Sequence, residues 1–149
     1  MADAMAPERV VAAARGWLGT PYRHQASLRG AGADCLGLVR GLWRELVGPE
    51  PETPPPYARS WAEDGAPDLL AQAAGRWLIP ASPGEIAAGD VLLFRLKPGG
   101  PPRHAGVACG PDRMIHAYDG HGVVETPIAP AWRRRLAARF RFPASSFDI

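Results

Sequence analysis

The sequence predicts a single α+β domain, residues 1–149, in which helices come first and an antiparallel sheet follows. Apolar residues recur at helical spacing in the segments before residue 79. From Asp90 onward, short runs of alternating or β-branched residues are separated by Gly, Pro and Asp turns. Helices followed by a run of strands are typical of the α+β class. A length of 149 residues with 46% apolar content suits one domain with one core.

The first helix is predicted to begin near Pro7 and to end at Gly19. A third helix is predicted over residues 67–78, where leucine, alanine and tryptophan recur on one side. Between the second and third helices, the stretch from Pro49 to Pro56 is rich in Pro and Glu and is expected to be an extended surface excursion. The sequence leaves open whether this excursion lies over a cleft as a lid.

The second helix is predicted to begin at Cys35, with Asp34 as its N-cap. Its buried side is formed by residues spaced three and four apart: Leu38, Val39, Leu42, Trp43 and Leu46. Unpaired N–H groups place about half a positive charge at a helix N-terminus. We therefore expect the Cys35 thiol pKa to be lowered, which favours the nucleophilic thiolate. The alternative is a small cysteine that is simply buried where a helix starts.

The second half of the chain is predicted to form about five antiparallel strands. The strands are expected at residues 90–96, 103–109, 114–118, 123–128 and 136–142. Residues 79–88 are expected to form a loop, and residues 130–134 a single helical turn.

Two histidines fall on one face of the hairpin formed by the second and third predicted strands. Side chains alternate along a strand, so His104 shares its face with Gly106 and Ala108. With His116 on the same face, the two histidines become near-diagonal neighbours about 7–8 Å apart at Cα. The small residues beside them are expected to leave room for a helix. A register slip of one residue would separate the two rings.

Cysteine, histidine and a polar group that orients the histidine together form the machinery of thiol-dependent acyl transfer. In this interpretation Cys35 attacks a carbonyl, His104 takes and returns the proton, and His116 holds the His104 ring. The Cys35 N–H is a candidate oxyanion donor. The three residues could instead be zinc ligands, but no C-x-x-C or H-x-x-x-H motif accompanies them. No metal or cofactor is predicted.

The remaining thiol and imidazoles are expected to have minor roles. Cys109 alternates with the core set and is expected to pack there, so the two cysteines form no disulfide framework. His24 and His121 are expected in loops, with His121 as the substitute candidate for His116.

Five motifs, in order along the chain, resemble those of the NlpC-type cell-wall peptidases. They are Gly19-Thr20-Pro21-Tyr22, Asp34-Cys35-x-Gly37-Leu38-Val39, Gly89-Asp90-Val91-Leu92-Leu93-Phe94, His104-x-Gly106-Val107 and Met114-Ile115-His116-Ala117. The resemblance implies a papain-like core with the nucleophile at a helix start. It also implies hydrolysis of peptide bonds in peptidoglycan stem peptides, commonly the bond between γ-D-glutamyl and a diamino acid. The residues after Pro21 and Cys35 look like those of the phage-tail and gene-transfer-agent branch.

Carried over to this sequence, the resemblance implies that Cys35 is the nucleophile, His104 the base and His116 the third polar group. Tyr22 matches a tyrosine that lies beside the thiol and helps bind substrate or the oxyanion; an ordinary loop tyrosine is the alternative. Asp34 matches a residue that contacts a free amine of the substrate in some members, and it can also be a plain helix cap.

The sequence departs from the family pattern beside the nucleophile. Most members have Ser or Gly after the cysteine, where this chain has Leu36, which leaves the bond cleaved undetermined. Many relatives carry Trp-Gly-Gly after the tyrosine, where this chain has Arg23-His24-Gln25.

Composition limits the partners and the location. With a net charge of +2 and no basic run longer than Arg133-Arg134-Arg135, the chain is not expected to bind nucleic acid. The N-terminus lacks the pattern of a signal peptide, and no stretch is apolar enough to span a bilayer. We expect synthesis in the cytoplasm and, for action in the periplasm or cell wall, delivery by a phage-like particle.

Three functions remain open at this point. The first is a cysteine endopeptidase that acts on peptidoglycan stem peptides, carried by phage-like tail proteins. The second is a non-catalytic structural or wall-binding tail component with the same fold. The third is a thiol acyltransferase or amidase.

Overall fold

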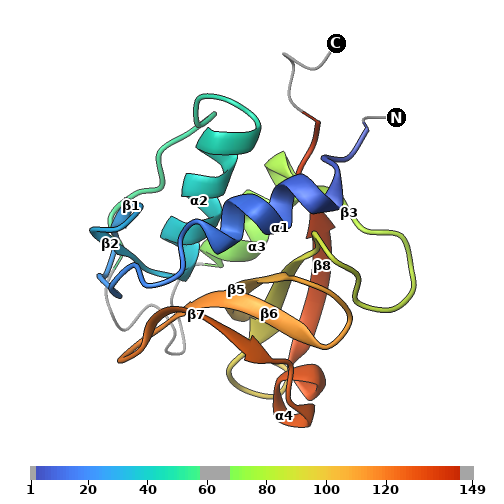
Figure 1. The fold of residues 1–149 in the computed structure, drawn as a ribbon. Coiled ribbons are helices and arrows are strands. Elements are labelled where there is room, and N and C mark those ends of the chain that lie inside the picture. The colour runs from blue at the N-terminus through green and yellow to red at the C-terminus, as the bar shows by residue number, and fades with distance from the viewer. Residues whose placement is uncertain (1–2, 58–67, 145–149) are drawn as a thin grey trace.

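The computed structural model describes residues 3–57 and 68–144 and confirms the predicted order, helices first and an antiparallel sheet after them (Figure 1). The helices are α1 (Pro7–Arg15), α2 (Cys35–Leu46), α3 (Leu69–Trp77) and α4 (Pro130–Arg134). None of the helices in the described residues is long and apolar enough to cross a membrane.

The main sheet has six antiparallel strands in the order β3-β8-β4-β5-β6-β7. These strands are β3 (Ile79–Pro80), β4 (Val91–Arg95), β5 (Pro102–Ala108), β6 (Arg113–Tyr118), β7 (Gly122–Pro127) and β8 (Leu136–Arg141). All five predicted strands are present. Strand β3 lies in a segment predicted as a loop, because two residues that include a proline carry no alternation to detect.

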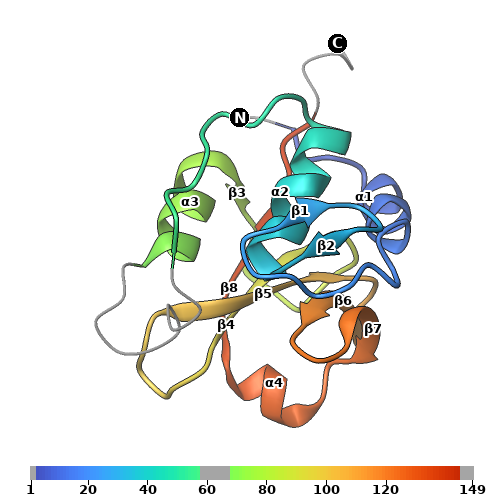
Figure 2. The same ribbon diagram turned by 90° about the vertical axis from the view of Figure 1, so that its left-hand side faces the viewer.

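A separate two-stranded sheet was also not predicted. Strands β1 (Ser27–Leu28) and β2 (Gly32–Ala33) form a hairpin beside α2 (Figure 2). Tyr22 bridges to Ala33 in parallel, so the predicted loop before Cys35 runs alongside the hairpin. The hairpin leads directly into Asp34 and therefore sets where α2 begins.

Two clusters of buried side chains lie on opposite faces of the sheet. Helices α1, α2 and α3 cover one face (Figures 1 and 2), where Ala105 and Val107 of β5 pack in the same cluster as Leu38 of α2. The other face holds a smaller cluster around Phe94 and Met114, against which Trp132 of α4 packs.

Helix α1 ends earlier than predicted, at Arg15 rather than near Gly19. Trp17, predicted as part of that helix, lies just beyond it and is still buried. Its indole Nε1 donates to Glu45 Oε1 at 2.9 Å, which ties this segment to α2. Helix α3 begins after its cap Asp68, while position 67 of the predicted helix lies outside the described residues.

Candidate active site

Cys35 is the first residue of α2, and Asp34 caps this helix as predicted. Asp34 Oδ1 accepts the Gly37 N–H at 2.7 Å, and the Asp34 carbonyl accepts the Leu38 N–H at 2.9 Å. These bonds satisfy the later N–H groups of the first turn and leave those of Cys35 and Leu36 available to the sulfur.

The Cys35 thiol is buried against strand β5 and is only 5% exposed. Backbone N–H groups of Ala105, Leu36 and Cys35 bond the sulfur and lower the thiol pKa. Ala105 is the residue next to His104, so the thiol reaches the strand one position from that histidine. The sequence alone did not indicate that a strand N–H would join the helix N–H groups around the sulfur.

The prediction of a lowered thiol pKa is wrong. Burial raises the pKa of Cys35 to about 12, and the neighbouring Asp34 carboxylate adds to this increase. The N–H groups act in the opposite direction with a smaller effect. The resting site therefore holds a neutral thiol, because removal of the sulfur from water outweighs the helix N-terminus.

His104 and His116 meet on one face of the sheet, which confirms the predicted pairing. His104 Nε2 lies 2.8 Å from His116 Nδ1, and the ring centroids are 5.1 Å apart. Val107 pairs with Ile115 and Ala108 with Met114, so the same register continued sets His116 opposite Gly106 and diagonal to His104. Both histidines are buried.

The space that Gly106 leaves is not used by a helix, contrary to our expectation. A Cβ at Gly106 would lie 3.2 Å from Met114 Sδ and 3.3 Å from His116 Cβ. The side chains of β6 thus fill this space, while α2 packs with Ala105 and Val107 on the other face. The missing side chain allows His116 to lie close to β5.

Both imidazoles are neutral near pH 7. Burial, with a smaller contribution from His116, lowers the pKa of His104 to about 3. Burial and the nearby His121 lower the pKa of His116 to about 4. A pair of neutral rings joined by one hydrogen bond needs one donor and one acceptor nitrogen, so the tautomers of the two rings are coupled.

Thr126 extends this pair, and sequence reasoning missed it. His116 Nε2 lies 3.0 Å from Thr126 Oγ1. His116 pairs with Val124 across β6 and β7, so Thr126 is its diagonal neighbour. The diagonal rule that joined the two histidines would also have found Thr126, had the register of the next hairpin been known.

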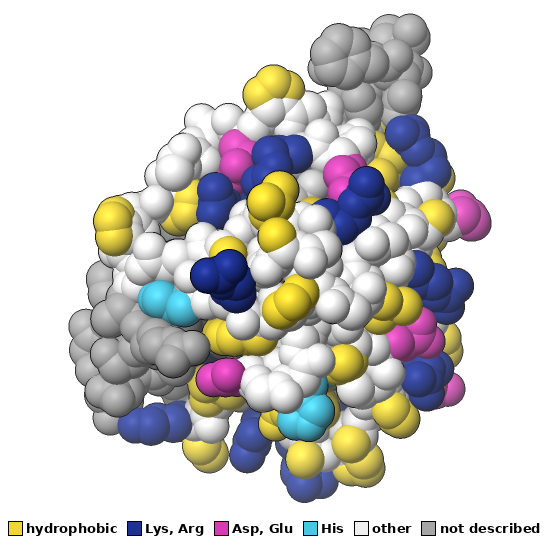
Figure 3. Space-filling model, turned by 60° about the vertical axis from the view of Figure 1, so that its left-hand side comes forward, with side chains coloured by type: hydrophobic (Ala, Val, Ile, Leu, Met, Phe, Trp, Pro, Cys, Tyr) yellow, Lys and Arg dark blue, Asp and Glu magenta, His cyan; other side chains and the backbone are white. Residues whose placement is uncertain are grey.

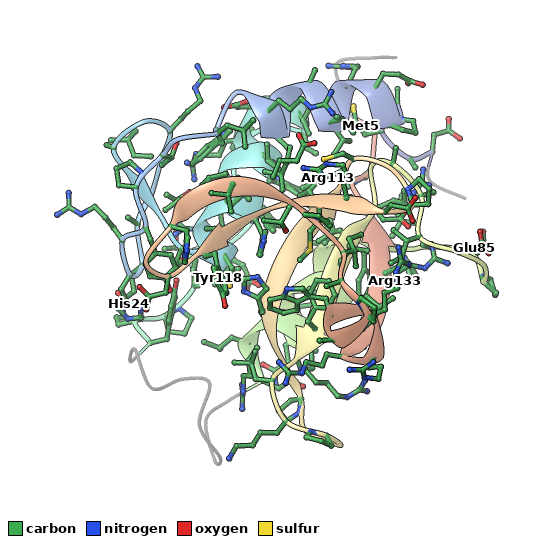
Figure 4. The ribbon with its side chains drawn as sticks, turned by 60° about the horizontal axis from the view of Figure 1, so that its bottom comes forward. Met5, His24, Glu85, Arg113, Tyr118 and Arg133 are labelled. Atoms are coloured by element: carbon green, nitrogen blue, oxygen red, sulfur yellow. The ribbon has the colours of Figure 1, made fainter. Side chains whose placement is uncertain are left out.

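An aromatic cluster surrounds the imidazole pair and includes a second residue that was missed. Trp132 stacks on His104 with ring centroids 5.0 Å apart and an interplanar angle of 28°. Tyr118, labelled in Figure 4 with Arg133 of α4, lies 5.4 Å from the His116 ring. Helix α4 was predicted only as an isolated helical turn, and nothing in its sequence pointed to the histidines.

The Asp34 carboxylate accepts more hydrogen bonds than helix capping requires. Its Oδ2 accepts the Gln25 N–H at 2.8 Å and the hydroxyl of Tyr57. The carbonyl of Tyr57 lies 2.7 Å from His24 Nε2 and also accepts a bond from the Gln25 side chain. Tyr57 was not among the candidate residues, since it follows a Pro-rich stretch without any motif.

The Pro-rich segment that precedes Tyr57, which could have been a lid, packs beside α2 and α3. It contains no helix or strand, as predicted, and Arg40 of α2 holds Glu50 at 2.6 Å. A hollow of about 120 Å³ lies between this segment, α2 and α3, and Leu36 lines it. The segment therefore lies beside α2, and its last described residue contacts Asp34.

Both the backbone and the side chain of Tyr22 contact residues close to Cys35. Its backbone bridges to Ala33, two residues before Cys35. Its half-buried side chain packs against the cluster that contains Cys35. Cys109 packs partly against the same cluster, as predicted, and His24 and His121 lie in turns.

Figure 3 shows acidic and basic side chains interspersed on the face that it presents. Within residues 3–57 and 68–144, no three or more His, Cys, Asp and Glu side chains are placed to hold a metal ion. The geometry thus sets the Cys35 thiol against Ala105, the residue next to His104 in β5, and within these described residues forms no ligand set.

Comparison with known proteins places the chain in a family. The NlpC/P60 family profile matches residues 19–141. Relatives named "Murein DD-endopeptidase MepS/Murein LD-carboxypeptidase" in Escherichia coli strains K12 and O157:H7 are each 31% identical over 120 residues. The alignment covers 80% of this chain and 54% of each relative, so the chain spans about half the length of the curated relatives that it matches.

Solved structures agree on the fold. The NlpC/p60 domain of the peptidoglycan hydrolase SagA matches with a TM-score of 0.59 and 23% identity, covering 93% of this chain and 100% of that domain. An NlpC/P60 family protein from Bacillus cereus matches with a TM-score of 0.63 and 19% identity, over 93% of this chain and 41% of that protein. With the family profile matched over most of its length, this chain belongs to the NlpC/P60 family.

Proposed function

We propose that this protein is a cysteine endopeptidase that hydrolyses peptide bonds in peptidoglycan stem peptides. Cys35 is its nucleophile, His104 its general base and His116 the residue that orients the base. The observation that carries the proposal is the thiol at the start of α2, which lies against the backbone of Ala105, the residue next to His104 in β5, while His104 is bonded to His116. Names of the relatives, which include murein endopeptidases, support the substrate class.

The first half of the reaction forms a thioester. His104 removes the thiol proton, and the sulfur attacks the carbonyl carbon of the scissile bond. The N–H groups of Cys35 and Leu36, at the start of α2, stabilise the oxyanion that forms. His104 then gives the proton to the leaving amine, and the first peptide product departs.

The second half regenerates the thiol. His104 takes a proton from a water molecule, whose oxygen attacks the thioester carbonyl. The carbon–sulfur bond breaks, the second product leaves as a carboxylic acid, and the proton returns to the sulfur. Because the resting thiol and imidazoles are neutral, proton transfer to His104 accompanies the attack rather than preceding it.

We further propose that Tyr22 and Asp34 line the substrate side of this site. The bond cleaved is the one between γ-D-glutamyl and a diamino acid, as the family resemblance implies. Leu36 presents an apolar side chain to the neighbouring hollow, where most family members have Ser or Gly. This difference makes direct identification of the bond essential.

The resemblance of the Tyr22 and Cys35 motifs to the phage-tail branch leads us to propose delivery by a phage-like particle. In that setting the protein contacts tail proteins and opens the wall locally, acting in the periplasm or cell wall. Purification of such particles from the source organism should recover this chain, and its absence from intact particles would remove this part of the proposal.

Digestion of purified sacculi tests the enzymatic proposal. The native protein should release stem-peptide fragments whose new termini, identified by mass spectrometry, name the bond. C35A should release none. C109A is the matched control and should keep native activity, because Cys109 only packs against the core. Fragment release by C35A would refute the assignment of the nucleophile.

One observation favours the non-catalytic alternative. Burial raises the pKa of Cys35 to about 12, which leaves the resting thiol weakly reactive. A substrate-like acyl electrophile separates the two functions. An enzyme should form a thioester at Cys35 that requires His104, whereas a structural component should form none.

A further inference from the structure

The Trp132 ring lies closer to His104 than the rings of Phe94 and Tyr118 do. Its indole stacks on His104, with centroids 5.0 Å apart at 28°, and meets the His116 ring edge-on at 5.8 Å and 85°. Phe94 contacts the indole at 5.0 Å and 63°, which fixes it from the sheet side. Neither the sequence motifs nor the proposed mechanism gives this residue a role.

The helix that carries Trp132 is tied to the turn between β5 and β6. Arg133 donates to the Pro111 carbonyl at 2.7 Å and to Asp112 Oδ1 at 3.0 Å. Pro130 occupies the first turn, where its fixed backbone angle suits a helix start. The position of the indole is thus set by contacts outside the imidazole pair.

We infer that Trp132 is a positioning residue that holds His104 in its reactive orientation and keeps water from the imidazole pair. This inference rests on the proposed function of His104 as the general base. A ring stacked on one face of His104 restricts rotation of the imidazole, while the His116 bond fixes the Nε2 edge. The indole stack and the hydrogen bond at Nε2 together leave Nδ1 as the nitrogen that accepts the thiol proton.

The indole also affects the charge that forms during the reaction. His104 is only 8% exposed beneath it, and exclusion of water disfavours the imidazolium form. An imidazolium over an indole face gains cation–π attraction, which partly offsets that effect. Other titratable groups around the pair are Tyr118 from β6 and His121 from the turn before β7, while Cys35 of α2 lies against Ala105, next to His104.

W132A tests the inference in two independent ways. By NMR, the pKa of His104 should rise from about 3 towards its ordinary value, because water gains access to the ring. In sacculus digestion, kcat should fall at least tenfold while KM stays within twofold, and the acid limb of the rate should move to higher pH. W132F, which keeps an aromatic stack, should restore kcat to within threefold of native.

W77F is the matched control, since this half-exposed indole on α3 bonds Glu52 and should leave both readouts unchanged. If W132A does not fold, W132L replaces it, and the same loss of kcat is expected because leucine fills space without stacking. Native kcat and an unshifted His104 titration in either variant would overturn the inference. If the native protein digests no sacculi, the titration still decides the role of Trp132, so the two proposals fail separately.

Discussion

The hydroxyl of Tyr57 donates a hydrogen bond to Oδ2 of Asp34, the residue immediately before Cys35. This bond links the end of the Pro-rich segment to the cap of α2. It also places a neutral donor against the carboxylate that raises the thiol pKa. A residue distant from every sequence motif is therefore coupled to the proposed nucleophile.

Y57F should destabilise the protein and make Cys35 less reactive. Loss of a buried donor to a carboxylate costs about 1–3 kcal/mol, which urea denaturation would detect. With its charge less balanced, Asp34 should raise the thiol pKa further, so alkylation of Cys35 at a fixed pH should slow. Y118F is the control for stability, because Tyr118 is 43% exposed, and its change should stay below about 0.5 kcal/mol.

The buried thiol should make the protein less stable in alkaline solution. The pKa of Cys35 is about 12 in the folded state and near 9 when exposed, so the folded chain retains the proton over this interval. Stability from this group is complete below about pH 9 and falls by up to about 1.4 kcal/mol per pH unit above it. Urea denaturation from pH 8 to pH 11 measures the slope.

C35S supplies the comparison for that experiment. Serine does not titrate in this range, so the difference in slope between the two proteins belongs to Cys35, while Tyr57 and Cys109 contribute equally to both. Parallel slopes would mean that the thiol is not held neutral. In the native protein, Cys35 should also be alkylated no faster than Cys109 near pH 7.

T126V should slow catalysis without weakening substrate binding. His104 accepts a proton on Nδ1 only if its Nε2–H donates to His116 Nδ1, which requires the His116 Nε2–H to donate to Thr126 Oγ1. Without this acceptor the tautomer is no longer fixed, and kcat should fall by roughly tenfold with KM unchanged. T126S keeps the oxygen and should retain most of the activity; a T126S defect equal to that of T126V would argue against the tautomer role.

Local patterns in the sequence predicted the elements of this fold, but contacts between distant segments decided the site. The Asp34 cap and the alternation that paired His104 with His116 depend on neighbours in the chain or on one hairpin, and both are present. The thiol pKa depends on how α2 packs against β5, and helix-end electrostatics alone predicted its direction wrongly. Trp132 and Tyr57 lie far from the motifs and reach the site only through tertiary packing.

Two glycines inside helices should respond oppositely to the same substitution. At Gly41 of α2, an added Cβ would lie 2.1 Å from the Trp17 indole, so α2 would have to move away from the segment after α1. At Gly75 of α3, no heavy atom beyond its chain neighbours and its own helix backbone lies within 4 Å of the added Cβ. G41A should therefore destabilise by about 1–3 kcal/mol, and G75A should stabilise by up to about 1 kcal/mol through helix propensity.

Activity should separate these two variants further. A shift of α2 carries Cys35 away from Ala105 and the imidazole pair, so G41A should lose hydrolysis even where it remains folded. G75A leaves α2 in place and should keep native kcat at a higher melting temperature. Equal stability of the two variants would contradict the close packing of Trp17 on Gly41, and native activity in G41A would show that the position of α2 does not limit the reaction.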